Sequence, residues 1–255
     1  MNAERTDAER EPDGDDTPRH ALQANKRRFR FRRTSEQRLN DKLLTALTLL
    51  LSILVFVVAP LEANGVIAGR YFGLIFGAVL VPAAFMLAVN WFAAGAMVVA
   101  ILLILIASEM EFRESTALDV YLDAIAWLIA GVTLSIVVSR AVFGPGKVTF
   151  HRILGGVLLY LTVGLTFVAL YGLVSLNVPE AFKGLEPVRT NYFAIAGNLI
   201  YFSFVTLTTV GYGDIVPVHP YARGLANLEA VIGQLYPATL LARLVTLELT
   251  SNKSS

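Results

Sequence analysis

Residues 194–220 read AIAGNLIYFSFVTLTTVGYGDIVPVHP, and this stretch decides the fold. It begins inside an apolar run, residues 192–207, that makes about four helical turns and is too short to cross a bilayer, which takes about 20 residues. Residues 209–213, TVGYG, follow almost at once, and their two glycines tolerate backbone dihedral angles that other residues avoid. Irregular backbone at membrane depth is allowed only where protein buries it or where it lines a cavity. The stretch therefore predicts a re-entrant helix and loop that other protein surrounds.

Long apolar runs surround this stretch. The 255-residue chain is 55% hydrophobic and 16% charged, with a mean hydropathy of +0.61, which is too apolar for one ordinary soluble domain. Most charges precede Leu43, and six apolar runs predict membrane-crossing helices: Leu43–Pro60, Ile67–Val89, Phe92–Ala107, Val120–Val138, Ile153–Val178 and Tyr221–Leu249. The absence of cysteine excludes disulfides and Cys-ligated metals. We predict an all-α membrane protein.

Positive charge is distributed as six crossings require. The tail of residues 1–41 is too polar to fold, and its second half carries a basic cluster of Lys26, Arg27, Arg28, Arg30, Arg32 and Arg33. This tail and the loop of residues 141–152 would face the cytoplasm, and the Glu-rich segment 109–119 would lie outside. A basic stretch beside a membrane span favours anionic lipid headgroups over nucleic acid. Both termini are therefore predicted to be cytoplasmic, with no nucleic-acid partner.

The segment TVGYGD, residues 209–214, matches the selectivity filter of potassium channels. Residues 148–250 resemble the two-helix pore module of the potassium-channel superfamily, and the whole chain is similar to bacterial six-span members in which four helices precede that module. Dehydrating K⁺ requires oxygen atoms that replace water, and backbone carbonyls supply these without a fixed charge. The resemblance implies a homotetramer that binds K⁺ through Thr209, Val210, Gly211 and Tyr212.

The same resemblance assigns roles to the other residues of the pore. Val210 and Tyr212 would pack behind the filter, and Asp214 would anchor its outer end. The selectivity filter would thus comprise Thr209, Val210, Gly211, Tyr212, Gly213 and Asp214, entered from a pore helix whose carboxyl end favours a cation. Gly233 stands where the family has the hinge glycine of its inner helix.

The predicted architecture is six transmembrane helices plus a re-entrant pore helix and selectivity filter. Its parts are a disordered cytoplasmic tail (1–41), a four-helix transmembrane domain (42–140), a cytoplasmic linker (141–152), a pore domain (153–250) and a C-terminal tail (251–255). The expected function is passive, K⁺-selective transport across the inner (plasma) membrane. We expect membrane lipids as surroundings, and neither a cofactor, a small-molecule substrate nor enzymatic activity.

Several residues depart from the family pattern. The fourth span carries only Arg140, at its cytoplasmic end, where voltage-gated relatives repeat arginine, so strong voltage gating is not expected. Few residues follow the last span, which leaves no room for a cytoplasmic ligand-binding domain. Tyr201 and Phe202 replace the paired tryptophans of the pore helix, which removes an indole donor to Asp214. Val205 stands where some bacterial channels place a glutamate.

Two residues of the last span are candidates for gating besides Gly233. Glu229 is a carboxyl group within a membrane helix, either functional or a hydrogen-bonded strut between helices. Pro237 must leave a backbone carbonyl unpaired and bend the helix, either as part of a gate or as a passive kink. The family's register would line the inner pathway with Gln234, Pro237, Leu241 and Val245.

Two other classes of protein were weighed against a channel. Residues 211–214 also satisfy the Gly-x-Gly-Asp pattern of intramembrane aspartyl proteases, which need a second facing aspartate. Asp119 and Asp123 are the only candidates, and neither follows the Tyr-Asp pattern of those enzymes. A non-conducting subunit of a larger assembly is the other alternative. His20, His151 and His219 lie far apart without the spacing of metal ligands.

Overall fold

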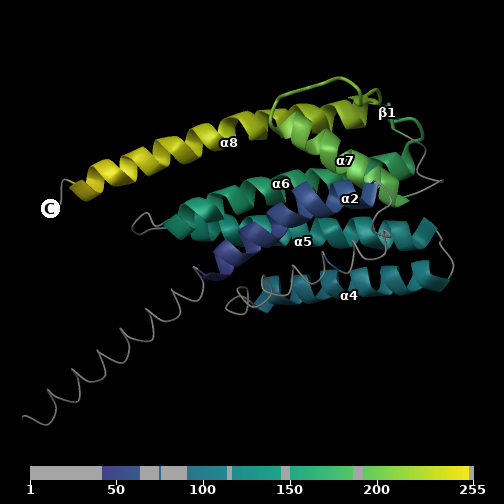
Figure 1. Ribbon diagram of the computed structural model, residues 1–255, viewed down its shortest axis with the longest axis horizontal. Coiled ribbons are helices and arrows are strands. Elements are labelled where there is room, and N and C mark those ends of the chain that lie inside the picture. The colour runs from purple at the N-terminus through teal and green to yellow at the C-terminus, as the bar shows by residue number, and fades with distance from the viewer. Residues whose placement is uncertain are drawn as a thin grey trace, which may run out of the picture. The chain divides into compact units, whose positions relative to one another are not determined.

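The computed structural model describes residues 42–63, 75, 91–113, 117–144, 150–185 and 192–252. The first helix covers residues 42–63 and contains a π-helical turn, η1. Within this helix, the last two labelled parts are η1 (Leu54–Val58) and α2 (Ala59–Ala63). The elements that follow are, in chain order, α4 (Trp91–Arg113), α5 (Ala117–Phe143), α6 (Phe150–Asn177), β1 (Phe182–Lys183), α7 (Tyr192–Leu207), β2 (Val216–Pro217) and α8 (Pro220–Asn252). The predicted all-α class is confirmed for these residues, apart from one two-residue strand pair (Figure 1).

Four of the described helices are long and apolar enough to cross a membrane. They cover Lys42–Leu61, Trp91–Met110, Val120–Phe143 and Phe150–Asn177, in agreement with the first, third, fourth and fifth predicted spans. The second predicted span, Ile67–Val89, and the tail of residues 1–41 lie outside the described residues. The sixth, α8, is 33 residues long and is not among the four. Six crossings therefore remain a prediction.

The helices begin and end further out than the apolar runs do. Helix α4 begins at Trp91, one residue before the predicted span Phe92–Ala107. Helix α5 ends at Phe143 and α6 begins at Phe150, which shortens the predicted linker of residues 141–152 at both ends. Polar and charged residues at helix ends continue the helix after the apolar stretch has stopped, which hydropathy alone does not indicate.

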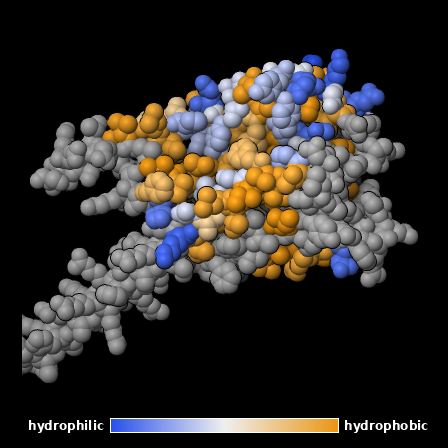
Figure 2. All heavy atoms as spheres, viewed as in Figure 1, coloured by the Kyte–Doolittle hydropathy of each residue, from blue (hydrophilic) through white to orange (hydrophobic). Residues whose placement is uncertain are grey.

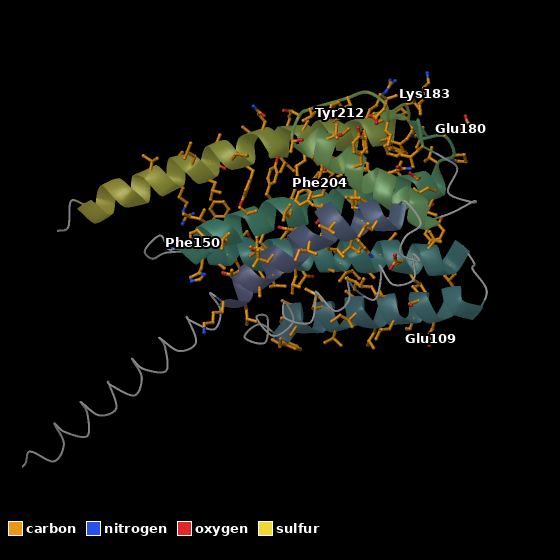
Figure 3. The ribbon with its side chains drawn as sticks, viewed as in Figure 1. Glu109, Phe150, Glu180, Lys183, Phe204 and Tyr212 are labelled. Atoms are coloured by element: carbon orange, nitrogen blue, oxygen red, sulfur yellow. The ribbon has the colours of Figure 1, made fainter. Side chains whose placement is uncertain are left out.

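Neighbouring helices pack in chain order, α4 on α5 and α5 on α6. Small residues allow close approach at the α5–α6 contact: a Cβ at Gly131 would lie 2.5 Å from Thr166 Oγ1. The first helix contacts α6, which is distant in sequence, because the hydroxyl of Thr48 donates to Leu154 O at 3.2 Å. Its α2 end packs on α7. The ring centroid of Phe204, a residue labelled in Figure 3, lies 6.0 Å from that of Phe56.

Helix α7 is held between α6 and α8 and contacts both (Figure 1). Leu199 and Phe202 are buried, as are Leu158 and Leu165 of α6, so an apolar core surrounds α7. In Figure 2, apolar side chains cover much of the lower flank of the helices, and hydrophilic ones gather toward the helix ends and along the upper side of the view, over α8. An apolar flank of this kind is typical of helices that face lipid.

Candidate functional site

The site is the loop that leaves the carboxyl end of α7. Backbone hydrogen bonds tie its first residues to the last turn: Thr209 N donates to Thr206 O at 2.9 Å, and Val210 N donates to Val205 O at 2.9 Å. Positive φ angles then occur at every second residue, +59° at Thr209, +59° at Gly211 and +80° at Gly213. Glycine adopts this conformation without steric cost, which agrees with the expectation for Gly211 and Gly213.

The positive φ of Thr209 is a feature that the residue type does not signal. A β-branched residue in the left-handed region is rare and strained. Thr208 continues the helical turn before it, with its Oγ1 donating to Phe204 O at 2.6 Å, so the change of hand begins at Thr209. The surrounding structure therefore imposes a backbone conformation that the sequence does not favour, as is common at functional sites.

The loop is open on one side. Residues 208–214 are all exposed in the single chain, including the large side chains of Val210 and Tyr212, which are 51% and 72% exposed. A Cβ added at Gly211 or Gly213 would meet no atom within 4 Å. Tyr212 nonetheless has one neighbour, because its ring stacks on Tyr201 with centroids 6.3 Å apart and planes 2° apart. The packing of Val210 and Tyr212 behind the filter stays a prediction.

Asp214 has a hydrogen-bond donor that the sequence analysis did not expect. The hydroxyl of Tyr201 donates to its carboxylate, and this bond holds the pKa of Asp214 below its ordinary value. The loss of the indole therefore does not leave Asp214 without a donor, because Tyr201 supplies a hydroxyl in its place. A phenol reaches the carboxylate from the pore helix as an indole would.

A small strand pair fixes the segment that follows Asp214. β1 and β2 are antiparallel, with Lys183 opposite Val216, and Ala181 O accepts from Val218 N at 2.9 Å. Gly184, with φ +87°, lies so close that a Cβ there would meet Asp214 O at 2.1 Å. The chain after α6 thereby supports the outer end of the loop, and only glycine fits the contact.

Helix α8 packs directly on the end of α7 at Gly233. A Cβ at Gly233 would lie 1.9 Å from Leu207 O, so the two backbones touch. The same carbonyl accepts a hydrogen bond from Tyr160 Oη at 3.0 Å, and the ring of Tyr160 stacks on Tyr236 at 5.7 Å. Helix α8 continues through both Gly233 and Pro237. The structure thus gives Gly233 a role in close packing, beside the hinge that was predicted there.

Glu229 is buried where α6, α7 and α8 meet. Its exposed fraction is 0%, and its carboxyl oxygens lie 2.6 Å from Tyr171 Oη and 2.5 Å from Ser203 Oγ. Tyr171 also belongs to an aromatic cluster with Phe182 and Phe202, whose rings meet edge to face at 5.0–5.6 Å. Glu229 therefore forms the inter-helix strut that the sequence left as one of two alternatives.

The other predicted residues are dispersed. Four residues that were predicted to line the inner pathway are exposed on α8, as such a position requires: Gln234, Pro237, Leu241 and Val245. His151 Nδ1 lies 2.8 Å from Thr45 Oγ1, and His219 accepts from Tyr221 N at 3.3 Å, so the two contact different elements. In the part of the chain that the structure describes, no three His, Cys, Asp or Glu side chains gather as a metal site.

Comparisons with known proteins agree with this geometry. Residues 157–248 match the family model described as ion channel. Protein LctB of Bacillus caldotenax is 31% identical over 87 residues, which are 34% of this chain and 64% of that protein. Protein LctB of Geobacillus stearothermophilus is 32% identical over the same length and shares. The chain thus spans somewhat less than two thirds of the length of these curated relatives.

No solved structure matches the chain significantly. The matched family segment begins in α6 and ends in α8, so it contains α7, the loop after it and most of both flanking helices. Through this segment, residues 157–248, the chain is similar to the ion channel family.

Proposed function

We propose that the protein is the subunit of a homotetrameric, K⁺-selective channel that conducts K⁺ passively across the plasma membrane. The observation that carries the proposal is the alternation of positive φ angles at Thr209, Gly211 and Gly213, within the sequence TVGYG. In an extended chain successive carbonyls face opposite sides, and a left-handed residue at every second position turns them toward one side. A row of carbonyls on one axis is what replaces the hydration shell of K⁺.

The exposure of the loop supports assembly around an axis. Backbone groups at membrane depth need partners, and residues 208–214 are open in one chain. Four copies around a closed symmetry axis would surround the loop, and each copy supplies one quarter of the ion site. Helix α8 also exposes Leu228, Val231 and Leu235, which are available for contact with a neighbouring copy.

The ends of the helices support the proposed orientation in the membrane. Glu109, Glu180 and Lys183 lie at one end of the helices and Phe150 at the other (Figure 3). Two basic side chains lie near the end of α5 that precedes Phe150, because Arg152 and Arg243 both donate to the carbonyl of Gly144. Positive charge at this end favours the cytoplasmic side, with both chain termini there and lipids around the helices.

The gate is proposed on α8. Gly233 and Pro237 lie one turn apart, and Arg243 near the end of α8 also contacts α5, with its guanidinium carbon 5.1 Å from the centroid of the Phe143 ring. Arg140 is the basic residue of α5, which leaves little charge to move in a membrane field, so strong voltage gating is not part of the proposal.

The protease alternative needs a second aspartate facing Asp214. Among the described residues, the side chain that shifts the pKa of Asp214 most is Tyr201, and no carboxyl group contributes to that shift. The protease mechanism requires two carboxyl groups that share one proton, and the phenol of Tyr201 cannot replace the second carboxyl group. The site therefore favours a channel, and the flux experiment below separates it from a non-conducting subunit.

The test is ion flux in vesicles. Purified full-length protein is reconstituted into liposomes, and flux is measured with outward K⁺ or outward Na⁺ gradients at equal ionic strength. We expect K⁺ flux well above that of empty vesicles and Na⁺ flux near the empty-vesicle level. Equal flux of both ions would overturn the K⁺ assignment, and no flux from tetrameric protein would favour the non-conducting subunit.

A further inference from the structure

Glu229 carries a question that the channel proposal does not answer, namely which atom holds the proton in its contact with Ser203. Among the residues whose burial the structure describes, Glu229 is the only fully buried Asp, Glu, Lys, Arg or His. Its burial arises within one chain, from α6, α7 and α8, so assembly into a tetramer cannot expose it. A polar group in this position must be satisfied by its immediate neighbours.

A count of hydroxyl hydrogens answers the question. Ser203 has one hydroxyl hydrogen, yet its Oγ lies 2.9 Å from Gly164 O and 2.5 Å from Glu229 Oε1. A backbone carbonyl only accepts. If Ser203 donates to Gly164 O, the hydrogen between Ser203 and Glu229 must come from the carboxyl group. Tyr171 donates to the other carboxyl oxygen at 2.6 Å, so every donor in the cluster then has an acceptor.

The charges around Glu229 support the same assignment. Among the described residues, no lysine, arginine or histidine contacts its carboxyl group, whose hydrogen-bond partners are Tyr171 and Ser203. The titratable groups that face it are Tyr171 and Tyr160, both from α6, while α7 presents the hydroxyl of Ser203. A buried carboxylate without a cation is strongly disfavoured, and two neutral donors do not replace its hydration.

We propose that Glu229 is a neutral carboxylic acid that donates its proton to Ser203, and that the hydrogen-bond chain Tyr171–Glu229–Ser203–Gly164 fixes α7 against α6 and α8. Glu229 is then a positioning residue for the filter, because α7 ends at the loop of residues 208–214. This role in selectivity rests on the proposed channel function, whereas the protonation itself does not. A glutamine reproduces both contacts, since its amide N–H donates and its amide oxygen accepts.

The first test is spectroscopic and uses the full-length wild-type protein and Glu229→Gln. We expect the infrared spectrum of the wild type at neutral pH to contain a carbonyl stretch of a protonated carboxyl group, and Glu229→Gln to lack it. Glu109→Gln is the matched control, because it removes a solvent-exposed carboxylate and leaves that band in place. A wild-type spectrum without the band, or a band that persists in Glu229→Gln, would overturn the proposal.

The second test compares Glu229→Gln with Glu229→Ala in the vesicle assay and in thermal unfolding. Loss of the hydrogen-bond chain should lower the K⁺/Na⁺ flux ratio of Glu229→Ala by about tenfold, as expected for about 1.4 kcal/mol. Glu229→Gln should recover most of that loss, and equal losses in both variants would contradict the neutral acid. Absent flux in the wild type would count against the channel function alone, because the infrared band still decides the protonation. If Glu229→Ala does not fold, the Glu229→Gln spectrum remains decisive.

Discussion

Helices α4 and α5 and the segment α6–α8 are held together by different kinds of contact. Helix α4 meets α5 through apolar side chains such as Met97 and Ile104, and only 22% of its most apolar window is buried, against 61% for α6. In the second region hydrogen bonds cross between helices, as from Tyr160 to Leu207 O and from Tyr236 to Gly156 O.

The difference has a physical consequence for what each region can do. Apolar contacts are non-directional, so the α4–α5 pair depends on size and shape and tolerates many sequences. Hydrogen bonds are directional, and those around α7 specify one position for the end of the pore helix. A loop that must place backbone oxygens accurately requires directional hydrogen bonds. The following substitutions test whether such bonds hold the loop in place.

The largest effect is expected for Gly233→Ala. The added Cβ would lie 1.9 Å from Leu207 O and 2.7 Å from Leu207 C, and both are backbone atoms that cannot rotate away. Overpacking of this kind costs about 1–3 kcal/mol or more, so we expect a large drop in thermal unfolding temperature in detergent and loss of the tetramer.

Gly224→Ala is the matched control, because a Cβ at Gly224 on the same helix meets nothing within 4 Å of it in the chain. If Gly233 served only as a hinge, Gly233→Ala would unfold at the wild-type temperature and would change only channel opening.

The second effect concerns the loop itself. Gly211→Ala places a Cβ on a residue with φ +59°, which costs about 1–2 kcal/mol in the left-handed region. The space around the residue is open, so the fold should survive while the loop relaxes to another conformation. We expect loss of K⁺ selectivity in vesicles with an unchanged tetramer on size-exclusion chromatography.

Gly95→Ala on α4 is the control for that variant, because its Cβ also meets no atom but its backbone is helical. Equal K⁺ selectivity in Gly211→Ala and Gly95→Ala would show that the positive φ is not needed for conduction.

A smaller effect, dependent on pH, is expected for Tyr201→Phe. The Tyr201 hydroxyl lowers the pKa of Asp214, so the contribution of ionised Asp214 is complete above the ordinary carboxyl pKa of about 3.9 and is lost as pH falls through the lower folded value. Removing the hydroxyl raises the pKa of Asp214. The acid-induced loss of K⁺ selectivity should therefore move to higher pH, measured as flux ratios across an external pH series.

Tyr121→Phe serves as its control, because this hydroxyl donates to Asn177 Oδ1, in a contact that involves no residue of the loop. An identical acid profile for Tyr201→Phe and the wild type would mean that Asp214 does not need this donor.

The smallest effect is expected on α4. It tests the conclusion that α4 is held by apolar packing against α5. Leu105 is 47% exposed and its neighbour Ile104 is 1% exposed. Leu105→Ala should change the free energy of unfolding by less than about 0.5 kcal/mol, whereas Ile104→Ala should cost about 2–5 kcal/mol. Comparable losses in both variants, measured by thermal unfolding in detergent, would mean that the outer face of α4 packs on protein and not on lipid.

The sequence predicts the features that depend on residue type and periodicity. Apolar runs located four of the helices. The short run before the loop predicted a helix over residues 192–208, one residue longer than α7, and the two glycines of the loop were expected to adopt unusual backbone angles. Each of these follows from local chemistry, since length decides whether a helix can cross and only glycine is free of steric cost at positive φ.

The sequence does not predict the contacts between distant residues. The partners of Glu229 lie 58 and 26 residues away, and no local pattern marks Tyr171 or Ser203. The donor to Asp214 was missed because Tyr201 was compared with an indole and not considered for its own hydroxyl. Gly233 was assigned as a hinge because a helical glycine carries no signal of the backbone that approaches it.

The most direct test of the central claim is the reversal potential of the reconstituted protein in a planar bilayer. One side holds mostly K⁺ and the other mostly Na⁺, with equal total salt, so that only a selective pore produces a potential. A K⁺-selective pore predicts reversal close to the K⁺ equilibrium potential in the wild type and near zero in Gly211→Ala. Reversal near zero in the wild type would contradict it.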